Sequence, residues 1–109
     1  MYINSTGFYI PKERVPNSYF LNINGLTDEW IRQRTGIQTR SKAAAGEGHN
    51  SMGLNAITDA IKKLPYAVED VDLIVSAAYA PYDTVATLAH IAQRNFGMHK
   101  AKAIYASSA

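Results

Sequence analysis

Hydrophobic residues between positions 50 and 65 recur every three or four positions, the spacing of one face of an α-helix. This stripe consists of Leu54, Ile57, Ile61 and Leu64. Asn50 or Ser51 can cap the start of such a helix, and Pro65 cannot continue it. The pattern therefore predicts a helix that begins near residue 50 and ends before Pro65.

A second stripe with helical spacing lies between positions 83 and 97. Its inward-facing residues are Val85, Leu88, Ile91, Ala92 and Phe96. Asp83 has the short acceptor side chain of an N-cap, and Gly97 is a residue type that often follows a helix. We expect a helix that Asp83 caps and Gly97 ends.

Elsewhere the apolar residues form short runs instead of stripes. Val71–Ala78 contains Leu73-Ile74-Val75, and an unbroken run of this kind is typical of a strand buried on both faces. Lys102–Ala106 predicts another strand, and Met1–Ile10 predicts a strand closed by Pro11. Helix and strand alternate from residue 50 onward, so we predict an α/β layered fold, with a mixed sheet and flanking helices.

The stretch from residue 27 to residue 37 carries the clearest local signals. Thr27 can cap a short helix, and the first turn contains Asp28 and Glu29, where the helix dipole favours negative charge. Gly36 is a natural stop. We expect the flanking residues 12–26 to be irregular, 37–40 to be extended and 43–49 to form a loop.

Trp30, the only tryptophan, and Arg34 lie four residues apart and therefore share one face of this helix. An indole beside a guanidinium can stack a flat heterocycle and also hold a phosphate. The same pattern is typical of a core tryptophan that a surface arginine covers. The pair is thus either a ligand platform or a packing feature.

Composition excludes several classes of protein. The 109 residues contain no cysteine, so a disulfide scaffold, a zinc–thiolate site and a thiol nucleophile are absent from this sequence. The formal charge of +2, from 11 basic and 9 acidic residues, does not suggest nucleic-acid binding. No apolar run approaches the roughly 18 residues that span a membrane, so we expect a soluble, cytoplasmic protein.

The charge is unevenly distributed along the chain. Positions 32–42 hold four basic residues and no acid, which indicates either an anion site or a solvated face. These residues are Arg32, Arg34, Arg40 and Lys42.

Candidate catalytic and metal-binding groups are sparse. His49, His90 and His99 are isolated and lack a second ligand at metal-site spacing, so we predict no metal. Ser107 and Ser108 lack the flanking glycines of a nucleophile elbow, and no catalytic residue is assigned. Residues 79–83 follow a predicted strand and form either a pocket wall or a plain connection to the next helix.

One combination of motifs resembles a known family. Asp28-Glu29-Trp30-Ile31-x-x-Arg34-Thr35-Gly36-Ile37 resembles the N-terminal signature of β-ketoacyl-acyl-carrier-protein synthase III, a condensing enzyme of the thiolase superfamily. Gly7–Pro11, Asp72–Val75 and Ala106–Ala109 are similar to its first strand, its next strand and the run before its nucleophile. The resemblance implies that residues 1–109 are the N-terminal part of a truncated domain, about half of a thiolase-like layered fold.

In that family the nucleophilic cysteine follows such a run immediately, at the N-terminus of a helix that lowers the pKa of the thiol. The resemblance implies that the complete protein performs a decarboxylative Claisen condensation of an acyl-coenzyme A with malonyl-acyl carrier protein, in fatty-acid or polyketide biosynthesis. It also implies that these 109 residues alone are inactive. Coenzyme A thioester is the expected substrate, with no tightly bound cofactor. The expected partners are an acyl carrier protein and a second subunit.

Individual residues carry over by position. Trp30 resembles the residue that stacks on the adenine of coenzyme A, and Arg34 the basic residue at the nucleotide end. We expect Arg40 and Lys42 to add charge near the phosphates. Val85 and Leu26 differ from the common pattern. Val85 replaces a bulkier residue that shapes the acyl pocket of the partner subunit, and Leu26 replaces a polar residue near the coenzyme.

Two other classes of function remain open from the sequence. One is a non-catalytic binding or scaffold domain with the same fold, and the other is nucleic-acid binding through residues 32–42. A half-domain would leave an apolar face of its sheet uncovered, so we also expect self-association.

Overall fold

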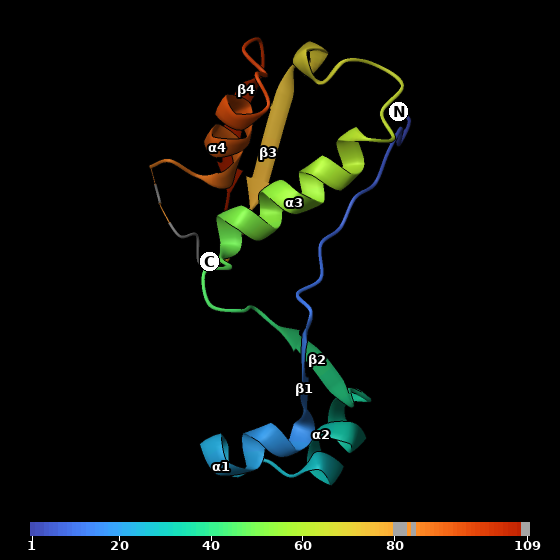
Figure 1. Ribbon diagram of the computed structural model, residues 1–109, viewed down its shortest axis with the longest axis vertical. Helices are drawn as coiled ribbons and strands as arrows, with labels where there is room; N and C mark the ends of the chain where they lie inside the picture. Colours follow the sequence, from blue (N-terminus) through green and yellow to red (C-terminus); the bar gives the residue numbers. More distant parts are fainter. Residues whose placement is uncertain (80–82, 84, 108–109) are drawn as a thin grey trace. The chain divides into compact units, whose positions relative to one another are not determined.

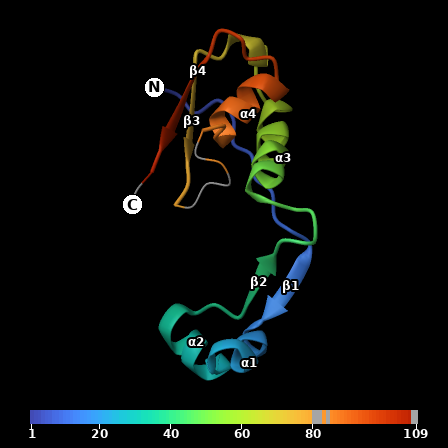
Figure 2. The same ribbon diagram turned by 90° about the vertical axis from the view of Figure 1, so that its left-hand side faces the viewer.

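The computed structural model describes residues 1–79, 83 and 85–107. The chain divides into two compact units, Met1–Tyr9 with Gly48–Ala109 and Ile10–Glu47. Figures 1 and 2 show the elements of both units from two directions.

The unit Ile10–Glu47 consists of a two-stranded antiparallel sheet and three short helical segments between its strands. Strand β1 (Glu13–Pro16) pairs with β2 (Thr39–Lys42), with Val15 opposite Arg40. The helical segments are the 3-10 helix η1 (Asn17–Phe20), α1 (Leu21–Asn24) and α2 (Asp28–Thr35).

Helix α2 begins and ends where the sequence predicts. The Thr27 hydroxyl accepts the backbone N–H of Trp30 at 3.2 Å, which satisfies one of the unpaired donors of the first turn. Gly36 ends the helix with a φ of 71°, a conformation that favours glycine. Ile31 is the only buried residue of α2, so this one side chain makes most of the apolar contacts between the helix and the rest of the unit.

The region before α2 was wrongly predicted to be irregular. Residues 12–26 contain β1, η1 and α1, and the extended piece expected at 37–40 is β2, two residues later. The strand β1 has only four residues, and the two helical segments have one turn each. Elements this short have no sequence periodicity to detect.

The unit Met1–Tyr9 with Gly48–Ala109 is built on a parallel strand pair. Strand β3 (Leu73–Ala77) pairs with β4 (Lys102–Ala106), with Val75 opposite Ile104. Its helical segments are α3 (His49–Ile61), the 3-10 helix η2 (Val68–Asp70) and α4 (Leu88–Asn95). Helix α4 contacts both strands and α3, and Figure 2 shows both helices on one side of the strand pair.

Only one face of this strand pair is covered in the part of the chain that the structure describes. Ser76 is buried beneath the helices, whereas Val75 is 58% and Ile104 47% exposed. The prediction that β3 is buried on both faces was therefore wrong for these residues. The prediction of an uncovered apolar face is confirmed, and Leu73 belongs to the same exposed face.

The starts of α3 and α4 differ from the prediction. Gly48, not Asn50 or Ser51, is the N-cap of α3, and its N–H donates to the Ser51 hydroxyl at 2.9 Å. Helix α4 begins at Leu88, because the Asp83 carboxylate instead accepts the N–H groups of Val85 and Ala86 in a turn. Val85 is consequently 82% exposed, not inward-facing as predicted.

The N-terminal residues form no strand, contrary to the prediction, because strand structure needs a hydrogen-bonded neighbour. Residues 1–9 lie against α3 instead. The Ser5 hydroxyl donates to the Ala60 carbonyl at 2.7 Å, and the Phe8 N–H donates to Asp59 at 3.3 Å. Gly7 lies so close to the helix that a side chain would overlap the backbone of Ala56.

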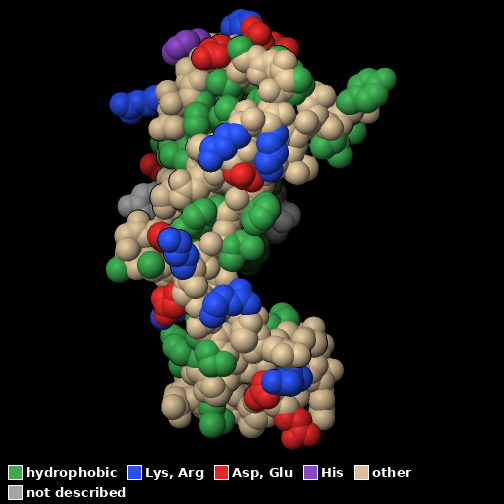
Figure 3. Space-filling model, turned by 45° about the vertical axis from the view of Figure 1, so that its right-hand side comes forward, with side chains coloured by type: hydrophobic (Ala, Val, Ile, Leu, Met, Phe, Trp, Pro, Cys, Tyr) green, Lys and Arg blue, Asp and Glu red, His purple; other side chains and the backbone are tan. Residues whose placement is uncertain are grey.

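No described helix combines the length and the hydrophobicity needed to cross a membrane. Figure 3 shows the Lys and Arg side chains scattered over the visible surface, several of them beside Asp or Glu.

Candidate functional site

Trp30 and Arg34 contact each other on the exposed side of α2. The guanidinium carbon of Arg34 lies 5.1 Å from the centre of the indole ring, within the range of a cation–π interaction. Trp30 is 44% exposed, so its ring is not a core side chain. The prediction that Trp30 and Arg34 share one face of the helix is thus confirmed. The alternative prediction, a tryptophan buried in the core, is wrong.

A pocket of about 250 Å³ lies beside the indole. Its lining is mostly apolar and comes from α1, α2 and the segments that flank them. The lining residues are Phe20, Asn24, Leu26, Trp30, Ile31, Thr35, Ile37 and Arg40. An aromatic wall with a few polar groups at the edge is the usual chemistry of a site for a flat heterocycle. Leu26, which departs from the family pattern, also lines this pocket.

Asn17 is the most buried large side chain of the described chain, at 1% exposure, and it holds the segments around α2 together. Its amide nitrogen donates to Asp28 at 2.8 Å and to the Ile37 carbonyl at 2.7 Å. Its amide oxygen accepts from the Arg40 guanidinium at 2.7 Å. The hydrogen bond from Asn17, and then that from Arg32, hold the pKa of Asp28 below its ordinary value.

The basic residues of positions 32–42 do not form one cluster. Arg32 pairs with Asp28 at 2.9 Å, and Lys42 lies 3.9 Å from Glu13. Arg40 lies over the Phe20 ring at 4.5 Å, and its Nη1 is buried without a hydrogen-bond partner among the described residues. Lys42 also lies over Tyr19, 5.2 Å from the ring centre. Of these four basic residues, Arg34 contacts Trp30.

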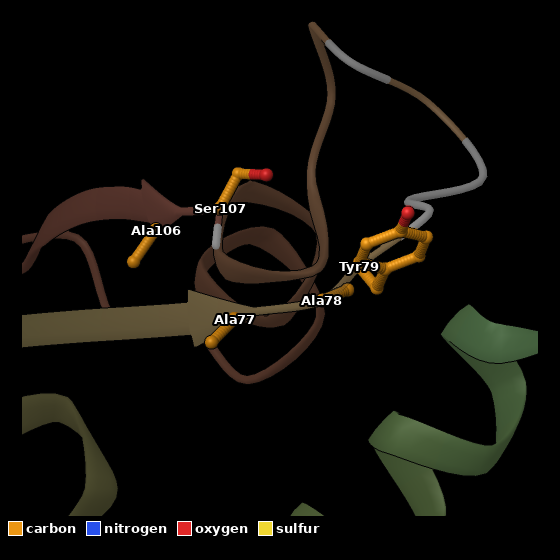
Figure 4. Close-up of a pocket in the computed structure, with 5 residues that line it drawn as sticks. All are labelled: Ala77, Ala78, Tyr79, Ala106 and Ser107. Atoms are coloured by element: carbon orange, nitrogen blue, oxygen red, sulfur yellow. The ribbon is translucent and has the colours of Figure 1, made fainter. Parts of the chain in front are cut away.

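A second pocket, of about 330 Å³, lies at the carboxyl ends of the parallel strands (Figure 4). Its lining residues are Ala77, Ala78, Tyr79, Ala106 and Ser107. The Tyr105 hydroxyl donates to the Ala78 carbonyl at 2.6 Å and ties the two strand ends together. Ligands of open α/β sheets bind at such ends. Tyr79 thus forms a pocket wall as one reading predicted, whereas residues 80–82 and Ser108-Ala109 lie outside the described residues.

The histidines take up local partners. The Thr87 hydroxyl lies 2.9 Å from His90 Nδ1, and His49 Nδ1 lies 3.4 Å from the Asn50 side chain. Within residues 1–79, 83 and 85–107, no group of three or more His, Asp or Glu side chains could hold a metal ion.

Comparison with known proteins shows the family to which this chain belongs. No family model matches the chain. A β-ketoacyl-[acyl-carrier-protein] synthase III of Wolbachia pipientis wMel is 40% identical over 92 residues, which are 84% of this chain and 29% of the relative. That of Oceanobacillus iheyensis is 36% identical over 107 residues, 98% of this chain and 34% of the relative. Over nearly all of its own length, the chain is homologous to synthase III. It spans about a third of the length of these curated relatives.

Two solved structures carry the same fold. The crystal structure of 3-oxoacyl-[acyl-carrier-protein] synthase III from Aquifex aeolicus VF5 matches 97% of this chain and 34% of its own, with a TM-score of 0.87 and 30% identity. The priming β-ketosynthase of the R1128 polyketide pathway matches 97% of this chain and 32% of its own, with a TM-score of 0.88 and 25% identity. The predicted α/β, thiolase-like fold class is thereby confirmed.

Asn17 and Phe20 are the residues of this region that sequence reasoning missed. Both lie in the stretch that was predicted to be irregular, where no periodicity marks an inward position. The only available signal was the Pro16-Asn17 pair, which indicates a turn. Nothing in that signal specifies that the asparagine is buried.

Proposed function

We propose that residues 1–109 form the N-terminal part of a thiolase-like condensing domain and bind the nucleotide end of an acyl-coenzyme A through Trp30 and Arg34. The observation that carries this proposal is the contact between an exposed indole and a guanidinium beside an apolar pocket. The adenine would stack on Trp30, and Arg34 would leave the indole face to bind a phosphate. Homology to synthase III supports the same ligand.

The whole protein would then transfer the acyl group from coenzyme A to a cysteine thiolate, releasing the coenzyme A thiol. Malonyl-acyl carrier protein would lose carbon dioxide, and the resulting carbanion would attack the acyl-cysteine and regenerate the thiolate. These 109 residues contain no cysteine, so the nucleophile has to come from other residues. The pocket at the ends of β3 and β4 is the candidate region for the reacting acyl group.

The proposed partners follow from the same enzyme class. They are an acyl carrier protein and a second copy of the protein, in the cytoplasm and with no tightly bound cofactor. Within the described residues β4 pairs only with β3, which leaves its other edge open to a strand of a second subunit. Its Ile104 side chain is exposed beside that edge.

The nucleotide proposal can be tested on this chain because Trp30 is its only tryptophan. Coenzyme A would be titrated while the fluorescence of Trp30 and its indole N–H resonance are followed. Stacking contributes roughly 1 kcal/mol and a charge-assisted hydrogen bond about 1.5–3 kcal/mol, so the expected dissociation constant is millimolar or weaker.

Two further titrations separate the parts of the ligand. Adenosine 3′,5′-bisphosphate should reproduce the fluorescence change, whereas pantetheine, which lacks the adenine, should not. If coenzyme A leaves both Trp30 signals unchanged, the nucleotide proposal is refuted, and a scaffold domain without coenzyme A becomes the better description.

A further inference from the structure

We propose that Asn17 is the positioning residue of the Trp30–Arg34 pair and shapes the pocket beside it. This inference rests on the proposed function, because it assigns the residue that sets the geometry of that ligand site. Asn17 itself is buried and would not touch the ligand.

The side chain of Asn17 connects the two ends of α2. It donates to Asp28, the first residue of the helix, and to the carbonyl of Ile37, just beyond its last residue. The backbone N–H of Asn17 donates to the Gln38 carbonyl at 3.3 Å. One amide therefore fixes the position of the helix along its axis.

Helix α2 depends on such external contacts. It has eight residues, and helices shorter than about 12 residues are marginal in water without tertiary contacts. Ile31 is its one buried residue, so a single apolar contact leaves rotation about the helix axis weakly determined. Trp30 is adjacent to Ile31, so a small rotation of α2 would change the direction of the indole.

Asn17 also orients the opposite wall of the pocket. Its amide oxygen accepts from Arg40, and the same guanidinium lies over Phe20. Arg40 and Phe20 both line the pocket that contains Trp30. The four groups that meet Asn17 come from α2, from the segment after it and from β2. Two of these residues, Ile37 and Arg40, line the candidate ligand pocket.

The decisive variant is Asn17→Asp. The new carboxylate keeps the shape and still accepts from Arg40, but it cannot donate to Ile37 and it repels the Asp28 carboxylate. The double variant Asn17→Asp with Asp28→Asn restores a hydrogen bond of reversed direction, since the new amide donates to the new carboxylate. Asp28→Asn alone is the control, because its carbonyl oxygen still accepts from Asn17.

Two measurements are made on the 109-residue chain. The first is the affinity for coenzyme A, which Asn17→Asp should weaken about tenfold, as expected when a hydrogen bond to a charged group is lost. The double variant should recover part of this affinity, because it replaces the hydrogen bond between residues 17 and 28 but not the one to the Ile37 carbonyl. The second needs no ligand. The Arg34 side-chain protons, held over the indole face, should show an upfield ring-current shift that Asn17→Asp reduces and the double variant restores in part.

If Asn17 had a purely structural role, Asn17→Asp would lower the free energy of unfolding but would leave the ring-current shift of the Arg34 protons unchanged in the folded variant. An unchanged Arg34 shift and affinity in folded Asn17→Asp would overturn the proposal. If that variant does not fold, an unrestored double variant overturns it instead. If the original chain does not bind coenzyme A, the proposed function fails, but the ring-current shift still tests Asn17.

Discussion

Replacing Gly7 with alanine should detach the N-terminal residues from α3. An alanine Cβ at this position would lie 2.3 Å from the Ala56 carbonyl oxygen and 2.5 Å from the Ala60 nitrogen. Both are backbone atoms of a helix and cannot move aside alone. The segment would therefore lose the hydrogen bonds that Ser5 and Phe8 make to α3, and we expect a cost of about 1–3 kcal/mol.

Two signals report this detachment in nuclear magnetic resonance. The Phe8 N–H should exchange faster with solvent. The hydrogen bond from the Lys63 ammonium is the largest cause that holds the pKa of Asp59 below its ordinary value, and the hydrogen bond from the Phe8 N–H is the second. Loss of the Phe8 hydrogen bond should therefore raise the pKa of Asp59 part of the way back. Gly48→Ser is the matched control, because a side chain at Gly48 meets no atom within 4 Å and a serine can cap α3. Slow Phe8 exchange and an unchanged Asp59 titration in Gly7→Ala would refute the steric argument.

Three other predictions concern charge and association. Arg34→Ala should weaken coenzyme A binding by roughly tenfold, as expected for a lost charge-assisted contact, whereas Arg32→Ala, which removes an equal charge from the same helix, should not. Titrations that follow the indole N–H resonance of Trp30 would compare the two variants. The chain should self-associate through the exposed face of β3 and β4, and Val75→Lys or Ile104→Lys should lower the mass found by light scattering; a monomeric original chain would contradict this. Because the pKa of Asp28 is lowered from 3.8, its contribution to α2 is complete above that pH and is lost as pH falls through the lower folded value. The acid-induced change in Trp30 emission should therefore shift in Asp28→Asn, and coincident curves would rule out this linkage.

Features set by neighbours in sequence were predictable. The start of α2 at Asp28 and its end before Gly36 depend on a hydroxyl three residues from its partner and on a backbone angle that favours glycine. The contact between Trp30 and Arg34 follows from a spacing of one helical turn. The parallel pairing of β3 with β4 follows from the alternation of helices and strands.

Features that depend on distant partners were not predictable. Asp83 has the chemistry of an N-cap in either position, and only the chain path decides that its carboxylate closes a turn before Thr87. Residues 1–9 have strand composition, but no described strand lies beside them. Asn17 acquires its role from Asp28, Ile37 and Arg40, which are 11 to 23 residues away.

The position of Arg34 also affects the heat capacity change on binding. In the free chain the guanidinium already covers part of one face of the indole, 5.1 Å from its centre. A stacking ligand would then replace one partner of the ring with another and remove little additional apolar surface from water. Burial of apolar surface is what makes the heat capacity change of binding negative. The enthalpy of association at Trp30 should therefore be nearly independent of temperature.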